Sequence, residues 1–247
     1  MSPGIADRRS GLANVADIII APGTAFERLR AVPTWGWAFL VASLLGIAGT
    51  LLIVPALQHA ADTSMPAQLA AMPQIAKLPP SQQASMIATQ MKFIRIGFRL
   101  AWLFVPILVL VGGAIQAVIM LIANAVGHGD GTFKKFFALS QNVAVVGIGL
   151  SSLVIGLIVT MHGASSFETM GAVQIVAPSL ALLAPGSHGA AAGFLGALNV
   201  FSIWAMVLLA LGMSGVAQIP RVPAWAAAIV MLLATAGYAA FGAARNG

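Results

Sequence analysis

Residues 136–161 read FFALSQNVAVVGIGLSSLVIGLIVTM, a run without one charged side chain. This run opens a longer segment, residues 136–220, in which Glu168 is the single formal charge. Soluble domains carry charge on about a quarter of their residues, whereas charged residues make up 7% of this chain and apolar residues 60%. The mean hydropathy is +0.97. The sequence therefore predicts a protein that folds in a lipid bilayer.

The apolar residues divide into runs long enough to be membrane-spanning helices. A helix needs about 20 mostly apolar residues to cross a hydrocarbon core of about 30 Å, and membrane barrel strands are shorter and alternate in polarity. We predict an all-α polytopic bundle with short amphipathic helices at the membrane interface. Residues 1–36 form an N-terminal interfacial segment, and residues 37–244 form a five-helix domain with an outer loop and helix over 58–97. The spans are 37–57, 98–126, 136–161, 193–214 and 224–243.

Lys and Arg residues predict the orientation, because cationic residues near short loops are retained on the cytoplasmic side. Five spans place the termini on opposite faces. The N-terminal face carries seven such residues: Arg8, Arg9, Arg28, Arg30, Lys134, Lys135 and Arg221. The other face carries five: Lys77, Lys92, Arg95, Arg99 and Arg245. We expect a multi-pass protein of the bacterial cytoplasmic (inner) membrane with its N-terminus inside and its C-terminus outside. Because the charges are scattered, the net charge of +6 indicates contact with lipid headgroups rather than nucleic acid.

Two short helices are expected before the first span. Leu12, Val15 and Ile18 recur at helical spacing, Pro22 breaks the pattern, and Thr24 is expected to cap a second helix. Both helices are expected to lie on the membrane surface with their apolar sides in the lipid boundary. They are either a plain membrane-entry anchor or a surface for a partner or lipid. The candidate residues of that surface are Phe26, Arg28, Arg30 and Trp35.

The segment 58–97 contains several prolines and then a helical pattern. Breaks are predicted at Pro66, Pro73 and Pro79-Pro80, after which Ser81 is expected to cap a helix that continues into the second span. Its apolar face is predicted to comprise Ile87, Met91, Ile94 and Phe98. The methionines of this segment lack the tight spacing of a Cu(I) site, so they are interpreted as apolar surface residues.

Residues able to perform chemistry are scarce within the spans. None of the predicted spans contains Asp or Glu, the chain has no cysteine, and the four histidines fall in separate loops or at span ends. Intramembrane ionisable groups are costly and mark ion-coupled transport or catalysis when they are present. Ser151, Ser152 and Ser202 have no base within the spans. We expect no enzyme activity, no catalytic residues, no cofactor and no metal.

Amide, hydroxyl and indole groups form the candidate site within the spans. In hydrocarbon such groups pair between helices, with about 0.6–2 kcal/mol for each hydrogen bond. Trp204, placed near the middle of the fourth span, is expected to give its indole N–H to a buried acceptor. The cluster is either structural or a polar groove for a lipid headgroup or small solute. It comprises Gln116, Asn124, Gln141, Asn142, Asn199, Ser202 and Trp204.

Small residues predict where backbones approach closely. Gly147 with Ser151, Gly193 with Gly196, and Gly212 with Gly215 have the three- or four-residue spacing of packed membrane helices, with Gly237 as a further position. The glycine-rich residues 127–131 lack the Gly-Lys-Ser/Thr ending of a phosphate loop. They predict a tight turn, with Thr132 as the cap of the next helix.

Several pieces of sequence, in a fixed order relative to the five spans, resemble one family. They are Ala21-Pro22, Phe26-Glu27-Arg28-Leu29, Pro33-Thr34-Trp35, Leu78-Pro79-Pro80-Ser81-Gln82-Gln83, Gly129-Asp130-Gly131-Thr132-Phe133-Lys134, Leu198-Asn199-Val200-Phe201-Ser202-Ile203-Trp204 and Leu208-Leu209-Ala210-Leu211-Gly212. Together they resemble the bacterial branch of the Yip-domain (Ypt/Rab-interacting protein) family of five-span membrane proteins, over nearly the whole chain. The resemblance implies a five-helix fold with a cytoplasmic N-terminus. It supplies no catalytic residues, and the trafficking role of eukaryotic members is not transferred.

Three classes of function follow. The leading hypothesis is a non-enzymatic membrane organiser or scaffold that contacts membrane lipids and binds a membrane-protein partner or a second copy of itself. The alternative is a translocator of lipid or a small solute along an amide-lined interior. An intramembrane enzyme is the third class, and the missing acids, bases and metal ligands argue against it.

Overall fold

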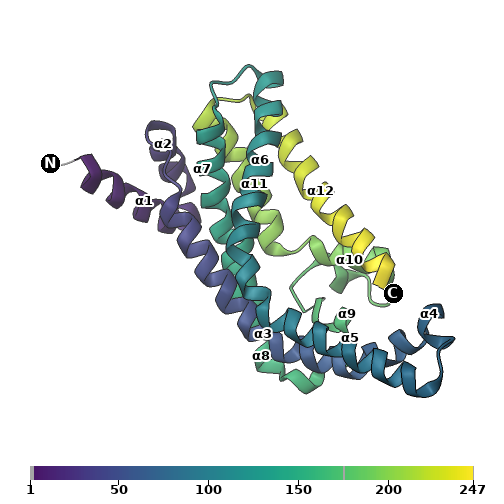
Figure 1. Ribbon diagram of the computed structural model, residues 1–247. Helices are drawn as coiled ribbons and strands as arrows, with labels where there is room; N and C mark the ends of the chain where they lie inside the picture. The colour runs from purple at the N-terminus through teal and green to yellow at the C-terminus, as the bar shows by residue number, and fades with distance from the viewer. Residues whose placement is uncertain (1–2, 175, 247) are drawn as a thin grey trace.

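The computed structural model describes residues 3–174 and 176–246, with the side chains of residues 11–173 and 176–244. Five of its helical segments are long and apolar enough to cross a membrane, which confirms the all-α polytopic bundle (Figure 1). Arg8, Arg9 and Arg245, which enter the charge count, lie outside the described side chains. The spans are α3 (Gly36–Ala70), α5–η1–α6 (Pro80–Leu100, Ala101–Phe104, Val105–Gly127), α7–η2–α8 (Phe133–Ala144, Val145–Leu150, Ser151–His162), α11 (Val200–Ala217) and α12 (Arg221–Asn246).

Shorter helices lie at the two ends of the bundle. α1 (Pro3–Ile20) and α2 (Pro22–Ala31) lie at one end, together with the loops between α6 and α7 and between α11 and α12 (Figure 1). We call this the α1–α2 end. The opposite end carries α4 (Pro73–Ala76), η3 (Ala164–Ser166), α9 (Met170–Gln174), η4 (Leu180–Leu183) and α10 (Gly189–Ala197).

The first span is longer than predicted. Instead of ending near Leu57, α3 continues through Pro55 and Pro66 to Ala70. Each internal proline removes one backbone donor. The continued helix compensates by burying Ala61 and Leu69 against Ile75 and Met91. The expected break at Pro66 is therefore wrong, whereas α4 and α5 begin at the predicted breaks, at Pro73 and Pro80.

α5 packs through the predicted face. Met91 is buried, and Ile87, Ile94 and Phe98 pack around it. Ser81 does not cap this helix, because Pro79 holds the N-cap position without a side-chain hydrogen bond. The second half of α3, with α4 and α5, forms a structure that extends sideways from the upright helices of the bundle (Figure 1). We call residues 58–100 the α3–α5 arm.

Among the described glycines, Gly49 comes closest to the backbone of another helix, where α3 crosses α8. A Cβ built on Gly49 would lie 2.2 Å from the carbonyl carbon and oxygen of Ser152, and one on Gly156 would lie 2.8 Å from the Gly49 oxygen. This crossing was not predicted. Among the predicted positions, Gly212 faces Leu139 and Phe26, whereas a Cβ added at Gly196 or Gly237 would meet no atom within 4 Å.

The fourth span begins later than predicted. Residues 193–214 were expected to form one helix, but α10 ends at Ala197 and α11 begins at Val200. Asn199 is the N-cap of α11: its side chain accepts hydrogen bonds from the amides of Phe201 and Ser202, each at 3.0 Å. The Ser202 hydroxyl accepts a hydrogen bond from the Asn199 backbone N–H at 3.0 Å. This capping box satisfies backbone amides that have no partner within the helix. It allows a new helix to begin at Val200, although the sequence on both sides of Asn199 is apolar.

Candidate functional site

The predicted polar residues occupy several separate places rather than one cluster. The Gln141 side chain extends from α7 to α6, where its amide donates to the Val109 carbonyl at 3.1 Å. It packs against Gly113, where a larger residue would leave no room for it. Asn142 faces the α1–α2 end, Asn124 lies in the last turn of α6 and binds the loop that follows, and Asn199 with Ser202 caps α11. Only Gln141 makes the expected hydrogen bond between spans. The prediction that the Asn199 side chain bonds to another helix is wrong, because this side chain caps its own helix.

A buried hydrogen-bond network fixes the α1–α2 end to the bundle. Asn14 is fully buried; its amide donates to the Thr34 hydroxyl at 3.2 Å, and its carbonyl accepts from the Arg28 guanidinium at 2.7 Å. Arg28 also forms an ion pair with Asp17. The amide of Asn142 on α7 donates to the Thr34 carbonyl at 3.0 Å. The network thus connects α1, α2, the linker before α3, and α7.

This packing corrects the predicted partner surface. Phe26 is 4% exposed and lies against Gly212 and Gly215 of α11, so α2 buries its apolar side in the bundle rather than in lipid. Arg28 is held by Asp17 and Asn14. Arg30 and Trp35 are exposed, and Trp35 also stacks edge-to-face on Phe137. Thr24 lies inside α2 and is not its cap, because that helix begins at Pro22.

Replacing Arg28 with Met tests this network. The change leaves the buried Asn14 carbonyl and the Asp17 carboxylate without their partner, so we expect a loss of about 2 kcal/mol of stability, moderated because Arg28 keeps some solvent contact. The measurement is thermal unfolding in nanodiscs. Arg30→Met is the matched control, because Arg30 is exposed on the same helix. Equal melting temperatures of the two variants would show that the network does not stabilise the fold.

The loop after α6 is packed against the connection between α11 and α12. The side-chain Oδ1 of Asn124 accepts from the Gly131 backbone amide at 2.9 Å, and the Asp130 backbone amide donates to the Ala217 carbonyl at 2.9 Å. Thr132 caps α7 by accepting from the Lys135 amide at 3.3 Å, as predicted. Asn124 therefore orders a turn between helices and lies outside any intramembrane cluster.

Trp204 does not belong to a buried polar cluster. Because α11 begins at Val200, Trp204 lies in the second turn near the end of the span, and it is 39% exposed. A tryptophan at this depth is ordinary, since the indole ring prefers the membrane interface. The expectation of a mid-span, hydrogen-bonded Trp204 is wrong, and a Trp204→Phe change has no structural reason to lower stability.

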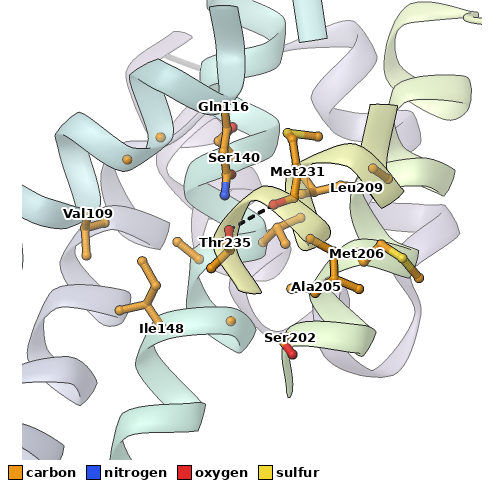
Figure 2. Close-up of a pocket in the computed structure, with 17 residues that line it drawn as sticks. Val109, Gln116, Ser140, Ile148, Ser202, Ala205, Met206, Leu209, Met231 and Thr235 are labelled. Atoms are coloured by element: carbon orange, nitrogen blue, oxygen red, sulfur yellow. Dashed lines mark hydrogen bonds between the residues drawn. The ribbon is translucent and has the colours of Figure 1, made fainter. Parts of the chain in front are cut away.

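Gln116 and Ser202 do share one place, a cavity of about 250 Å³ between α6, α7, η2, α11 and α12. Its other polar side chains are Ser140 and Thr235, and the rest of its lining is apolar. Figure 2 shows Gln116, Ser140 and Thr235 near one another and Ser202 farther down the cavity. Thr235 donates to the Met231 carbonyl at 2.9 Å. Sequence reasoning found Gln116 and Ser202 but missed Ser140 and Thr235, whose isolated hydroxyls gave no pattern.

Comparison with known proteins agrees with the membrane fold. Over 234 residues the chain is 29% identical to "Membrane protein YknW" of Bacillus subtilis (strain 168), covering 91% of this chain and 89% of that protein. The chain is a multi-pass membrane protein. No family model and no solved structure matches it. Its long exposed apolar surfaces, such as Leu108 and Ile122 on α6, are therefore surfaces for lipid or for other membrane helices.

Ionisable groups lie apart from the cavity in this membrane protein. Among the side chains that the structure describes, no three His, Asp or Glu come together to hold a metal ion. The described ion pairs are Arg28–Asp17, Arg95–Asp62 and Lys135–Asp130, and each joins neighbouring helices or helix ends. The cavity can therefore offer a ligand hydrogen bonds and apolar contact.

Proposed function

We propose that this membrane protein is a non-enzymatic, Yip-like organiser of the bacterial cytoplasmic membrane that binds a second copy of itself or another membrane protein. The polar side chains that line the cavity between its spans are an amide and hydroxyls, which do not act as general acids or bases at neutral pH. The observation that carries the binding role is the exposed apolar face of the α3–α5 arm. Proteins that act by assembly need such a surface in addition to their folded core.

The α3–α5 arm is a defined structure with two different sides. Its inner side is closed by the buried residues around Met91, and an ion pair at 2.9 Å joins Arg95 of α5 to Asp62 of α3. Its outer side exposes Met86, Phe93 and Leu100 at seven-residue intervals, with Phe93 68% exposed. Seven-residue spacing keeps apolar side chains on one helix face, which is the pattern that a partner helix recognises. The arm is therefore suited to helix–helix contact.

Site-specific photocrosslinking tests this proposal. A photoreactive phenylalanine at Phe93 is expected to give a discrete protein adduct in whole membranes, either a dimer of this chain or one identifiable protein. The same group at Ala88 is the matched control, because Ala88 is also exposed on α5 but lies on the side of Lys92 and Arg95. Adducts with lipid alone at Phe93, or equal protein adducts at both positions, would overturn the scaffold role.

The proposed orientation can be tested by cysteine labelling, because the chain has no cysteine of its own. Single cysteines at Glu27 in α2 and Gln82 in α5 replace exposed residues. With the N-terminus inside, a membrane-impermeant maleimide added to intact cells is expected to label Gln82→Cys and to spare Glu27→Cys. Permeabilised cells, in which both label, provide the control. The reverse pattern would show that the N-terminus is outside.

One observation favours the translocator hypothesis, which is the cavity between α6, α7, η2, α11 and α12 with its amide and hydroxyl side chains. A translocator must also pass its cargo to both membrane surfaces. Liposomes that contain the purified protein and a fluorescent lipid measure this directly, and protein-dependent flipping would favour the translocator over the organiser. The Yip-like assignment itself is supported by the order of sequence motifs and by five spans.

A further inference from the structure

The cavity between α6 and α12 is built from a buried floor and an exposed rim. Val109, Gly113 and Leu209 belong to the floor and are buried, whereas Thr235 at the rim is exposed. Gly112 also lines the cavity, and a Cβ on it would meet no atom within 4 Å. Two residues of the π-helical η2, Gly147 and Ile148, close one side. The space is thus enclosed by protein on several sides and reachable at Thr235.

An unsatisfied hydroxyl lies in this floor. Ser140 is 1% exposed, and its Oγ has no hydrogen-bond partner. Gln116 extends its amide into the same cavity (Figure 2) and makes no hydrogen bond with another described residue. Buried polar groups in proteins are almost always paired. Ser140 and Gln116 together offer both donors and acceptors, so a polar ligand atom in the cavity would satisfy the buried Ser140 hydroxyl.

The depth of Ser140 and Gln116 along their helices indicates whether a ligand enters from water or from the bilayer. Gln116 lies eleven residues before Gly127 at the end of α6, or about 16 Å at 1.5 Å per residue. Ser140 lies seven residues after Phe133 at the start of α7, or about 10 Å on the same scale. Both depths fall inside a hydrocarbon core of about 30 Å. A ligand that enters past Thr235 therefore comes from the bilayer.

The lining also restricts the chemistry of the ligand. None of the residues that line the cavity is charged, and a charged headgroup would lose its hydration there without a counter-ion. We propose that the cavity binds one neutral lipid with a hydroxyl headgroup, of the diacylglycerol type. The hydroxyl exchanges hydrogen bonds with Ser140 and Gln116, and an acyl chain leaves between α6 and α12. This binding is independent of partner contact through the α3–α5 arm.

Photolabelling of the full chain in phosphatidylglycerol nanodiscs tests the site. A diacylglycerol with a diazirine in its acyl chain is expected to label peptides of α6 and α12, and unlabelled diacylglycerol is expected to compete. Ser140→Ala is expected to raise the concentration of unlabelled diacylglycerol needed for competition about fivefold, because the loss of one neutral hydrogen bond of about 1 kcal/mol weakens binding by that factor. Gly112→Leu fills the open space and is expected to abolish labelling. Gly237→Ala, with no neighbour within 4 Å and outside the cavity lining, is expected to label as the unaltered chain does.

Melting temperatures, measured with and without diacylglycerol, distinguish a variant that has lost binding from one that has failed to fold. Added diacylglycerol is expected to raise the melting temperature of the unaltered chain and of Gly237→Ala, but not that of Gly112→Leu. Ser140→Ala is expected to melt no lower than the unaltered chain without ligand, because it removes an unpaired buried hydroxyl. Labelling spread evenly over the lipid-facing helices, labelling by a phosphatidylglycerol probe that Gly112→Leu abolishes, or no labelling at all would overturn the proposal. The last result would indicate a cavity that holds only water.

Discussion

Replacing Gly49 with Ala is expected to give the largest loss of stability among the single substitutions considered. The new Cβ would lie 2.2 Å from the carbonyl carbon and oxygen of Ser152 and 2.7 Å from the Leu153 nitrogen. These are backbone atoms, so no side chain can rotate away and α3 must move from α8. Overpacking a core by one carbon costs about 1–3 kcal/mol, and we expect about 3 kcal/mol or more when the contact is with backbone.

Thermal unfolding in nanodiscs measures this effect, with Gly237→Ala as the control. Gly237 is also inside a spanning helix, but its Cβ position has no neighbour within 4 Å. Alanine there adds helix propensity without a clash. We expect Gly237→Ala to melt at or above the temperature of the unaltered chain. A Gly49→Ala protein that melts with it would show that α3 and α8 do not approach as closely as described.

Gly129→Ala is expected to have the second-largest effect, by displacing the loop between α6 and α7. Its Cβ would lie 2.5 Å from Asn124 Oδ1, 2.6 Å from the Ala217 oxygen and 2.8 Å from Ile219. The loop would have to move off the α11–α12 connection, which would break the hydrogen bond from the Asp130 amide to Ala217. We expect a loss of about 2–3 kcal/mol from overpacking and the lost bond together.

Asp130→Ala is the control within the same loop. It keeps the backbone amide that bonds Ala217 and removes only an exposed ion pair with Lys135, which is worth about 0–1 kcal/mol. Hydrogen exchange of the amides of 128–132, together with melting temperature, separates the two variants. Rapid exchange only in Gly129→Ala is expected. If Asp130→Ala destabilises as strongly, the side-chain ion pair and not the backbone packing holds the loop.

The spans themselves were predictable because bilayer thickness imposes a length on every apolar helix. The third span illustrates this: residues 136–161 were predicted, and the helical segment runs from Phe133 to His162. The beginning of the fourth span was missed because hydropathy is high on both sides of Asn199. A signal was present, since Asn followed three residues later by Ser has the form of a capping pair. An apolar run long enough to span does not have to be one helix.

Partners between helices were less predictable than the helices. Gln141 and Asn142 are adjacent in sequence, yet one bonds Val109 in α6 and the other Thr34 before α3. Hydropathy fixes neither the rotation of a span nor its neighbours, so the polar residues could be found but not paired. The Gly49 crossing was missed for the same reason, because its partners at Ser152 and Gly156 lie on a helix distant in sequence.

The position of Phe26 under α11 has a consequence for the order in which the chain assembles. The seat of α2 is formed by Gly212 and Gly215, near the end of the chain. Synthesis runs from the N-terminus, so α2 leaves the ribosome first but finds its seat only after α11 has been inserted. Until then its apolar side has to be shielded by lipid or by a chaperone. We therefore expect α2 to dock late in biogenesis. Its docked state requires that α11, and with it the first four spans, has been inserted.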